Sequence, residues 1–577
     1  MGSVIGESKP GNPPSAFDIH RIAIIGAGPS GLASAKHLLA EGFSTIDIYE
    51  QQAEAGGVWN YSPATPSRPA LVPQTDAHAH PDLPIYPAEE KDECEDYVFD
   101  SDEEASTAPG SGACSLPAVA PKEKKPPVFP NPMYDVLHAN IPHTLMRYSD
   151  LGFTSDGNGR GTHEGCEIFP PRQVVLEYVL EYAREVRRFV RFSTQVTEIS
   201  LQPALEASPR EGQSWIRDKW TVRSTNLLTD TSCTETYDAV VVASGHYSAP
   251  YIPSAITGIS EFASAHPGVI SHSKSYRSAA AFAGKRVVIV GSGPSGLDIA
   301  SQISSVCEPP LVISARSPIP EDMAAYLGAG DKVRIVGTIK RFLIDEKGIE
   351  VHLAPTTTSE ATGEEKTEQI LDVDAILFCT GYLYTFPFIT ESSLPPSTPS
   401  LITDGRRVHS LARHFIHTHH STLVFPGLPI KIIPFPVAEA QAAVFSRLWS
   451  NRLPLPSHEE LRRWEREDEE GKGLEGSRVP GKSFHVFPRG GDARYINSLH
   501  DWALQARDGK RDKGKEPPFW GDEELWQRTI YAQAKMQFEK TGRKAKTLRE
   551  LGFWREREDG VDIKSVEGEE RTDVVAG

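Results

Sequence analysis

The sequence predicts an α/β fold of two similar units, the second inserted within the first, and three observations predict it. An apolar run, a glycine-rich turn and the start of a helix follow one another in RIAIIGAGPSGLASAKHLLAEG, residues 21–42. The same order returns in RVVIVGSGPSGLDIA, residues 286–300. A buried strand with a glycine exit, DAVVVASGHY at 238–247, is echoed by DAILFCTGYLY at 374–384. Short apolar strands that alternate with helices indicate parallel sheets with helical crossovers.

Both turns have the glycine spacing G-x-G-x-x-G. The first glycine makes the turn, the second lets a pyrophosphate approach the backbone, and the third lets helix and strand pack closely. Unpaired N–H groups at the helix N-terminus then bind the phosphates. One match is weak evidence, but two matches that each continue PSGL predict two dinucleotide-binding, Rossmann-like domains. The expected contacts are Gly26, Ala27, Gly28, Pro29, Ser30 and Gly31 in the first turn, and Gly291, Ser292, Gly293, Ser295 and Gly296 in the second.

The residue at the end of the next strand distinguishes the two nucleotides. STIDIYEQQ ends its apolar run at Glu50, followed by Gln51, and a carboxylate there accepts hydrogen bonds from a free ribose 2′-hydroxyl and repels a 2′-phosphate. LVISARS carries Arg316 at the matching distance from its own turn, where a guanidinium suits a 2′-phosphate. The first turn is therefore expected to bind FAD and the second NADPH. The alternative for both residues is an exposed side chain at a strand end.

Composition breaks suggest the domain organisation. Prolines and the acidic run EEKDECEDYVFDSDEEAS mark a surface insertion that is expected to be largely disordered, with a regulatory or docking segment as the alternative. The charged helical C-terminal part, with stretches such as DEELWQRTIYAQAKMQFEKTG, is expected to wrap the surface. The predicted parts are a flexible leader (1–18), an FAD-binding domain (19–245, with the insertion at 62–127), an NADPH-binding domain (246–374), a return segment of the FAD-binding domain (375–456) and the C-terminal extension (457–577).

Charge and cysteine usage exclude several classes of protein. The formal net charge of −18 disfavours a nucleic-acid partner. The six cysteines are scattered and form no C-x-x-C, which excludes zinc knuckles and dithiol redox centres and fits a reducing compartment. No apolar run reaches the length of a membrane span or of a signal peptide. We therefore expect a cytoplasmic protein with no membrane span that acts on a small molecule; a homodimer stays open.

Three fates are open to a flavin that NADPH has reduced. A dithiol reductase needs a C-x-x-C beside the flavin, and an electron-transfer protein needs an iron–sulfur cluster or a docking site. Neither a cysteine pair nor a cysteine cluster is present. Reaction with dioxygen remains.

Several motifs occur in the order seen in flavin-containing monooxygenases, and the chain resembles the soluble fungal-type members of that family from 21 to 456, outside the insertion. These motifs are GAGPSG, EQQAEAGGVWN, HANIPHTLMRYSDLGF, ASGHYSAPYIPSAITG, HPGVISHSKSY, GSGPSG, CTGYLYTFPF and FPGLPIKIIPFPVAEAQAAVFSRLWSNRLPLP. The family signature F-x-G-x-x-x-H-x-x-x-(Y/F) aligns on Gly268, His272 and Tyr276, with His266 in place of the leading Phe. Baeyer–Villiger monooxygenases, the sister group, carry Trp where this chain has Tyr276.

The resemblance implies an FAD-dependent monooxygenase that uses NADPH and O2 to oxygenate a nitrogen or sulfur centre through a C4a-hydroperoxyflavin. It also implies roles for single residues. Asn140 matches an asparagine over the flavin that contacts NADP⁺, and it is the one predicted catalytic residue. The flavin-contacting segment GGVWN implicates Val58 and Trp59, and the strand with Val196 meets the adenine of FAD. The helix starting near Pro436 points at the flavin, with Gln441 in its second turn.

Other interpretations stay open. A loop-capping Asn140, core packing for Trp59 and Val196, and a Gln441 without flavin contact are the structural alternatives. At the level of function, the alternatives are a Baeyer–Villiger monooxygenase and a non-catalytic flavoprotein that senses redox state. We expect no metal site. Four neighbouring histidines, in RHFIHTHHSTLVF at 413–425, lie on a predicted strand, where alternation sends them to opposite faces. His272 is expected to be structural.

Overall fold

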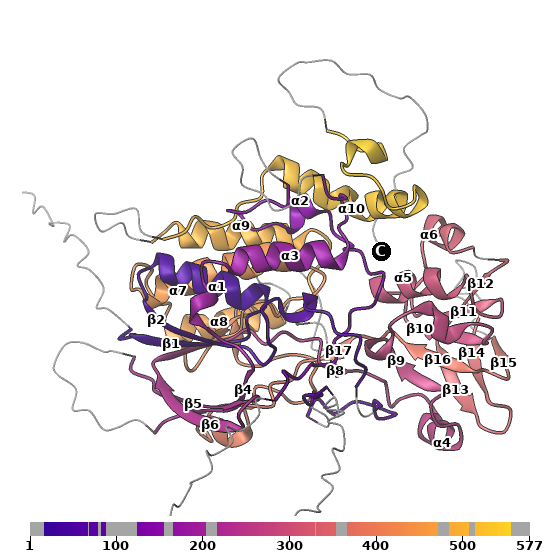
Figure 1. The fold of residues 1–577 in the computed structure, drawn as a ribbon, viewed down its shortest axis with the longest axis horizontal. Coiled ribbons are helices and arrows are strands. Elements are labelled where there is room, and N and C mark those ends of the chain that lie inside the picture. The colour runs from indigo at the N-terminus through magenta and orange to yellow at the C-terminus, as the bar shows by residue number, and fades with distance from the viewer. Residues whose placement is uncertain are drawn as a thin grey trace, which may run out of the picture.

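The computed structural model describes residues 17–66, 69–78, 82–87, 124–154, 165–203, 216–328, 330–353, 366–470, 484–506 and 514–555. Two α/β domains lie side by side, and the predicted fold class is confirmed (Figure 1). No helix among the described residues is long and apolar enough to cross a membrane.

The first domain is built on a seven-stranded sheet with the strand order β18-β19-β20-β7-β1-β2-β3. The strands are β1 (Arg21–Ile25), β2 (Thr45–Tyr49), β3 (Val190–Arg191), β7 (Ala239–Val242), β18 (Leu411–Ala412), β19 (Ile416–His417) and β20 (Leu423–Val424). Strands β20, β7, β1, β2 and β3 run parallel.

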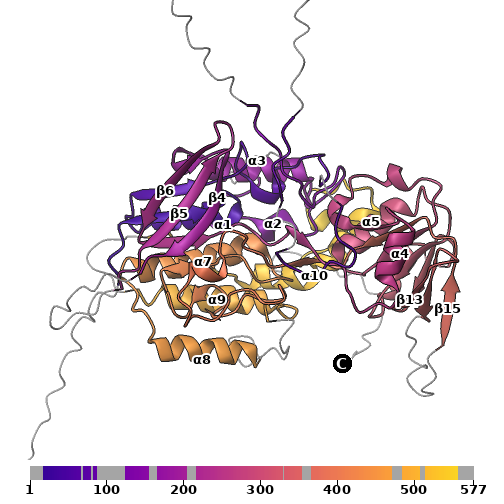
Figure 2. The same ribbon diagram turned by 90° about the horizontal axis from the view of Figure 1, so that it is seen from below.

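Both faces of this sheet are covered, as the alternating side chains of its central strand, β1, show. Ile22 and Ile24 pack with helices, whereas Ala23 and Ile25 pack with a second, antiparallel sheet. The helices are α1 (Pro29–Ala40), α2 (His143–Met146), α3 (Arg172–Ala183) and α7 (Pro434–Trp449), and the antiparallel strands are β4 (Thr194–Leu201), β5 (Trp220–Asn226) and β6 (Thr231–Tyr237). Figure 2 shows β4–β6 on the face away from α7.

The second domain repeats this plan on five parallel strands in the order β12-β11-β10-β16-β9. They are β9 (Ile270–His272), β10 (Val287–Val290), β11 (Leu311–Ser314), β12 (Val333–Val336) and β16 (Ala375–Phe378). Helices α4 (Ile259–Ala265), α5 (Pro294–Ile303) and α6 (Glu321–Tyr326) and the sheet β13 (Ile339–Leu343), β14 (Gly348–His352) and β15 (Thr367–Ile370) complete the domain.

One predicted boundary is wrong. We expected the chain to return to the first domain at 375, but β16 pairs along its length with β10 of the second domain. The echo between DAVVVASGHY and DAILFCTGYLY arises because β7 and β16 hold equivalent places, each beside the strand that leads into a glycine turn. The chain crosses outward through β8 (Ala249–Pro250) and returns through β17 (Tyr382–Leu383), which pair between the two domains (Figure 1).

The predicted disorder of the 62–127 insertion is wrong for its described parts. Gln74 is buried and Ala77 belongs to the hydrophobic core of the first domain. Val72 packs against a core cluster of the second domain. Residues 67–68, 79–81 and 88–123 of the insertion, and 1–16 of the predicted leader, lie outside the described residues. A proline-rich composition therefore did not prevent specific packing at 69–78 and 82–87.

The C-terminal extension is helical, as predicted, but only part of it is superficial. Its helices are α8 (His458–Glu469), α9 (Gly491–Ala503) and α10 (Asp522–Lys540). Tyr495, Ile496 and Leu499 of α9 belong to the same hydrophobic core as α1 and α7, whereas α8 lies on the outer edge of the domain (Figure 2). The extension thus completes the core of the first domain.

Candidate cofactor and active site

The first glycine turn, Gly26–Gly31, joins β1 to α1 and leaves no space for side chains at its ends. Gly26 has a φ of +106°, and a Cβ there would lie 2.6 Å from the Ala243 carbonyl oxygen. A Cβ on Gly31 would lie 2.0 Å from the oxygen of Gly26. Strand, turn and helix therefore pack as the spacing predicted.

The second glycine turn, Gly291–Gly296, has the same geometry. Gly291 has a φ of +113°, and its Cβ would lie 2.6 Å from the Cys379 carbonyl oxygen, while that of Gly296 would lie 2.2 Å from the oxygen of Gly291. A Cβ on Gly293 would meet nothing within 4 Å. Gly293 and Ser295 are exposed and Ser292 is partly exposed at the N-terminus of α5. This open approach to unpaired N–H groups fits a pyrophosphate.

Glu50 lies directly after β2 and faces the first turn. Its carboxylate accepts the N–H of Ala27 at 2.8 Å and that of Gln52 at 2.9 Å, and the residue is only 4% exposed. Burial raises the pKa of Glu50 to about 7, although these backbone N–H groups oppose the shift. Each oxygen keeps a lone pair for a ribose hydroxyl, so the predicted role fits the geometry.

We expect the affinity of the apoprotein for FAD to rise as the pH increases toward the Glu50 pKa of about 7, and to level off above it. Ribose hydroxyls donate to the ionised carboxylate, so binding favours the deprotonated form, and the slope is at most about tenfold per pH unit. Titration of the apoprotein with FAD, followed by flavin fluorescence at several pH values, measures it. Glu50→Gln should show no such slope, and an identical slope in that variant would contradict the assignment.

Arg316 is an exposed residue two positions after the end of β11. Strand β11 pairs with β10 as β2 pairs with β1, with Ser314 in the place of Tyr49. Arg316 therefore lies one residue beyond the position equivalent to Glu50, at the same edge of the second sheet. Within the described residues Arg316 forms no ion pair, so its guanidinium is available for an anion.

The GGVW segment lies against the first turn. A Cβ on Gly57 would lie 2.9 Å from Cα of Gly28. Val58 and Trp59 follow in a short 3-10 helix (Gly57–Trp59), and both are partly exposed. The ring of Trp59 meets that of Phe435, in the first turn of α7, edge to face at 6.4 Å. The predicted flavin-contacting segment therefore lies between the first turn and the N-terminus of α7.

The edge of β4 runs past Glu50 and Gln51. The N–H of Thr194 donates to the carbonyl of Glu50 at 2.8 Å, on the side away from β5, and Nε2 of Gln195 donates to Oε1 of Gln51 at 3.1 Å. Val196 is two residues beyond Thr194, so its backbone groups point to the same free edge. Its side chain is buried in the core, and only its backbone is placed for the predicted nucleotide contact.

Helix α7 begins at Pro434, two residues before the predicted position. The N–H of Ile433 before it donates to the buried carboxylate of Asp492 at 3.0 Å. Pro434 and Pro436 have no N–H, so the first turn of the helix offers chiefly the N–H of Phe435 to a ligand.

The predicted flavin contact by Gln441 is wrong. Its side chain is fully buried, its Oε1 accepts the Gly427 N–H at 2.8 Å and its Nε2 donates to the Tyr495 hydroxyl at 3.0 Å. A Cβ on Gly427 would lie 2.4 Å from Oγ of Ser30. Gln441 therefore positions the backbone beside the first turn and does not itself reach a ligand.

Asn140 is exposed, and its side chain makes no hydrogen bond to another described residue. Its neighbours are fixed, since the Ala139 N–H donates to Pro170 at 2.8 Å and the His143 N–H to Ile168 at 2.9 Å. A capping Asn140 would accept a backbone N–H, and no described N–H donates to it, so its amide is available to a ligand.

A buried carboxylate that was not predicted from the sequence holds the segment after Asn140. Glu439 of α7 is fully buried and accepts the Ser149 hydroxyl at 2.6 Å and the Ser149 N–H at 2.9 Å. It also forms an ion pair with Lys515 of the C-terminal extension. Burial alone raises the pKa of Glu439, but Lys515 and His37 outweigh it and hold the pKa at about 2. Residues so far apart in sequence gave no local signal.

The four neighbouring histidines do not share a ligand. His414 lies 3.3 Å from His485, His417 accepts the N–H of His420, and His419 lies 2.7 Å from Arg462. Among the described ranges, no three His, Cys, Asp or Glu side chains are arranged to hold a metal ion.

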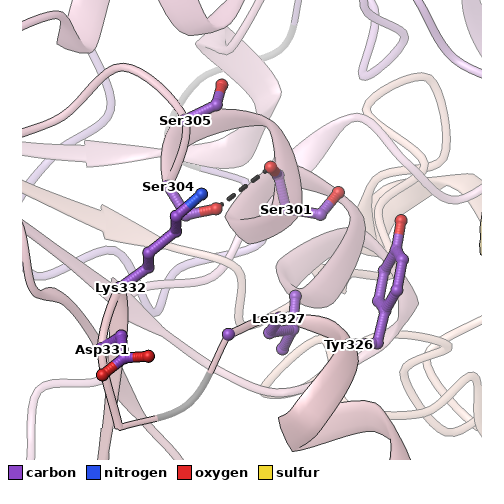
Figure 3. A pocket seen from close by; sticks show the side chains of 8 residues that line it. Ser301, Ser304, Ser305, Tyr326, Leu327, Asp331 and Lys332 are labelled. Carbon is purple, nitrogen blue, oxygen red and sulfur yellow. Dashed lines mark hydrogen bonds between the residues drawn. The ribbon is translucent and has the colours of Figure 1, made fainter.

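A cavity of about 320 Å3 lies in the second domain (Figure 3). Ser301, Ser304 and Ser305 line it at the C-terminal end of α5, with Tyr326 and Lys332 opposite. The second glycine turn lies at the other end of this helix, so the cavity is not part of the cofactor site.

Two dinucleotide turns, one followed by a buried acid and the other by an exposed base, define a flavin- and nicotinamide-dependent oxidoreductase. The Flavin-binding monooxygenase-like family model matches residues 132–319, and an NAD(P)-binding Rossmann-like domain model matches 24–82. Flavin-containing monooxygenase FMO GS-OX-like 2 of Arabidopsis thaliana is 28% identical over 90% of this chain and 91% of its own length. Flavin-containing monooxygenase ustF2 of Aspergillus flavus is 27% identical over 89% and 98%.

A solved structure agrees in fold. S-allyl-L-cysteine S-oxygenase from Allium sativum has a TM-score of 0.62 and 23% identity, over 93% of this chain and 98% of that one. Over most of its length the chain is similar to flavin-containing monooxygenases. It is a monooxygenase whose cofactors are FAD and NADPH.

Proposed function

We propose that this enzyme oxygenates a nitrogen or sulfur centre of a small molecule, with FAD at the first glycine turn and NADPH at the second. The observation that carries the choice of N- or S-oxygenation is Tyr276, where Baeyer–Villiger relatives are expected to carry Trp. Its ring is buried, meets Tyr134 edge to face at 5.3 Å, and its hydroxyl donates to Gln302 at 2.9 Å. The surroundings of Tyr276 therefore accommodate both the ring and the hydroxyl of a tyrosine.

The protein's own part in this chemistry is binding, orientation and exclusion of water. Bound FAD supplies the hydride acceptor and the oxygen chemistry. Glu50 holds the FAD ribose, Arg316 holds the 2′-phosphate of NADPH, and the N-terminus of α5 holds its pyrophosphate. The amide of Asn140 orients the bound nucleotide, and Glu439 with Lys515 keeps the segment after Asn140 in place.

Product analysis tests this proposal. The full-length protein is incubated with NADPH, O2 and either thioethers and tertiary amines or cyclic ketones. Sulfoxides or N-oxides formed in proportion to the NADPH consumed would support it. Esters or lactones without sulfoxide would establish the Baeyer–Villiger alternative, and peroxide as the only product, with no oxygenated substrate, would count against oxygenation.

Asn140→Ala is expected to leave the anaerobic rate of flavin reduction by NADPH unchanged and to raise the share of NADPH that ends as hydrogen peroxide. The variant removes an exposed amide that no described neighbour uses, so the fold should persist. Peroxide and product are measured together per NADPH oxidised. Unchanged coupling would remove Asn140 from the catalytic residues.

A further inference from the structure

Part of the insertion lies across both domains. Ala70 and Val72 pack against the core of the second domain, and Ala77 packs in the core of the first. Between them, Gln74 exchanges two backbone hydrogen bonds, each 2.9 Å, with Ile252, which follows β8. The described parts of 62–87, named here the strap, therefore add a third segment to the pair of crossovers β8 and β17.

Asp82 of the strap joins the two domains through one carboxylate. Its Oδ2 accepts the hydroxyl of Ser248, on the outgoing crossover just before β8, at 2.8 Å. Its Oδ1 lies 2.5 Å from Nζ of Lys274, which follows β9 of the second domain. Lys274 also donates to the carbonyl of Ser248. The three side chains thus tie the outgoing crossover, the strap and the second sheet to a common point.

The strap is also held at its beginning by the segment that follows β9. Arg277 donates to the carbonyl of Pro63 at 3.2 Å and to that of Ala64 at 2.5 Å. The same guanidinium bonds the carbonyl of Lys274 at 2.9 Å. Lys274 and Arg277, three residues apart in the second domain, therefore bind the strap at two separate places, Asp82 and 63–64.

Burial of the Lys274 ammonium costs free energy, and its pairing with Asp82 offsets this cost. Lys274 is 4% exposed, and burial lowers the pKa of its ammonium while Asp82 opposes that shift. A buried cation that loses its carboxylate partner is strongly destabilised. Movement of the second domain away from the strap would break this pair, so the pair favours one relative orientation of the domains.

We propose that Asp82 and Lys274 are positioning residues that fix the orientation of the NADPH-binding domain relative to the FAD-binding domain, and so the alignment of nicotinamide and flavin. This inference rests on the proposed placement of FAD and NADPH at the two glycine turns. Neither residue touches a cofactor in it; both act through the crossovers.

Asp82→Asn in the full-length, FAD-loaded enzyme tests the inference. Because a displacement of about 1 Å between reacting groups can cost 10²-fold, the limiting anaerobic rate of flavin reduction at saturating NADPH should fall about 10- to 100-fold. The dissociation constant of NADP⁺ should stay within about threefold of wild type, since its phosphate contacts lie within the second domain. Asp82→Glu should recover part of the rate.

Asp76→Asn is the matched control. Asp76 lies in the same strap. Its carboxylate accepts the His78 N–H at 2.8 Å and forms no ion pair with another described residue, so removal of its charge should leave the rate unchanged. If Asp82→Asn does not fold, Ser248→Ala, which removes one hydrogen bond to Asp82, gives a smaller loss of the same kind. An unchanged limiting rate in folded, FAD-loaded Asp82→Asn or Ser248→Ala would overturn the inference, as would parallel loss of rate and NADP⁺ affinity. A wild-type flavin that NADPH does not reduce would instead overturn the placement of the cofactors.

Discussion

Gly293→Asp is expected to prevent efficient reduction of the flavin by NADPH, while the protein stays folded and keeps its yellow FAD. A Cβ at Gly293 meets nothing within 4 Å, so the apoprotein can accept the side chain. The added carboxylate then occupies the approach of the pyrophosphate and repels its charge. Loss of two charge-assisted hydrogen bonds, each about 1.5–3 kcal/mol, predicts a decrease in kcat/KM for NADPH of about 10²- to 10⁴-fold.

The measurement is steady-state kinetics with NADPH, together with flavin content and thermal unfolding. Ser305→Asp is the control, because it adds the same charge to the same domain beyond the C-terminal end of α5. It should keep NADPH turnover. Loss of bound FAD in Gly293→Asp, or retention of normal NADPH kinetics, would show that the second turn does not bind the nicotinamide nucleotide.

Arg316→Ala is expected to weaken NADPH use about 10- to 150-fold and to leave NADH use almost unchanged. The exposed guanidinium has no ion-pair partner in the described structure, so its removal costs the fold little. It loses one or two charge-assisted hydrogen bonds to the 2′-phosphate, which NADH lacks. The ratio of kcat/KM for the two nucleotides measures the effect.

Arg334→Ala is the matched control for this variant. Arg334 is an exposed arginine on β12, the neighbour of β11, and it pairs with Glu368. Its removal should not alter the nucleotide preference. Equal decreases in kcat/KM for NADPH and NADH in Arg316→Ala would mean that Arg316 supports the fold and does not bind the 2′-phosphate.

The two domains and their glycine turns were predictable from local sequence. Turn, strand and helix are neighbours in the chain, and Gly26, Gly31, Gly291 and Gly296 are required by contacts within a few residues or with the adjacent strand. Local sequence patterns also led to the wrong prediction that the chain returns to the first domain at 375. A strand of the second sheet that lies beside its glycine turn has the same sequence pattern as a strand that returns to the first sheet. Only the strand to which it is hydrogen-bonded, β10 in the case of β16, distinguishes the two.

The features that sequence analysis missed depend on residues far apart in the chain. Glu439 pairs with Lys515, and Asp492 caps α7 from α9, so the charged extension carries groups that the first domain needs. Asp82 binds Lys274 although its surroundings have the composition of a disordered segment. Gln441 has the right place in the helix for a flavin contact, but its amide is used by Gly427 and Tyr495. Such pairings follow from tertiary packing, and no local pattern signals them.

Anaerobic titration of the purified protein with NADPH tests most directly whether the first site holds FAD and the second binds the NADPH that reduces it. We predict that the protein carries FAD and that one equivalent of NADPH bleaches the visible flavin band completely, with NADH far slower at the same concentration. A protein that fails to take up FAD, or whose bound FAD keeps its colour under excess NADPH, would contradict the account.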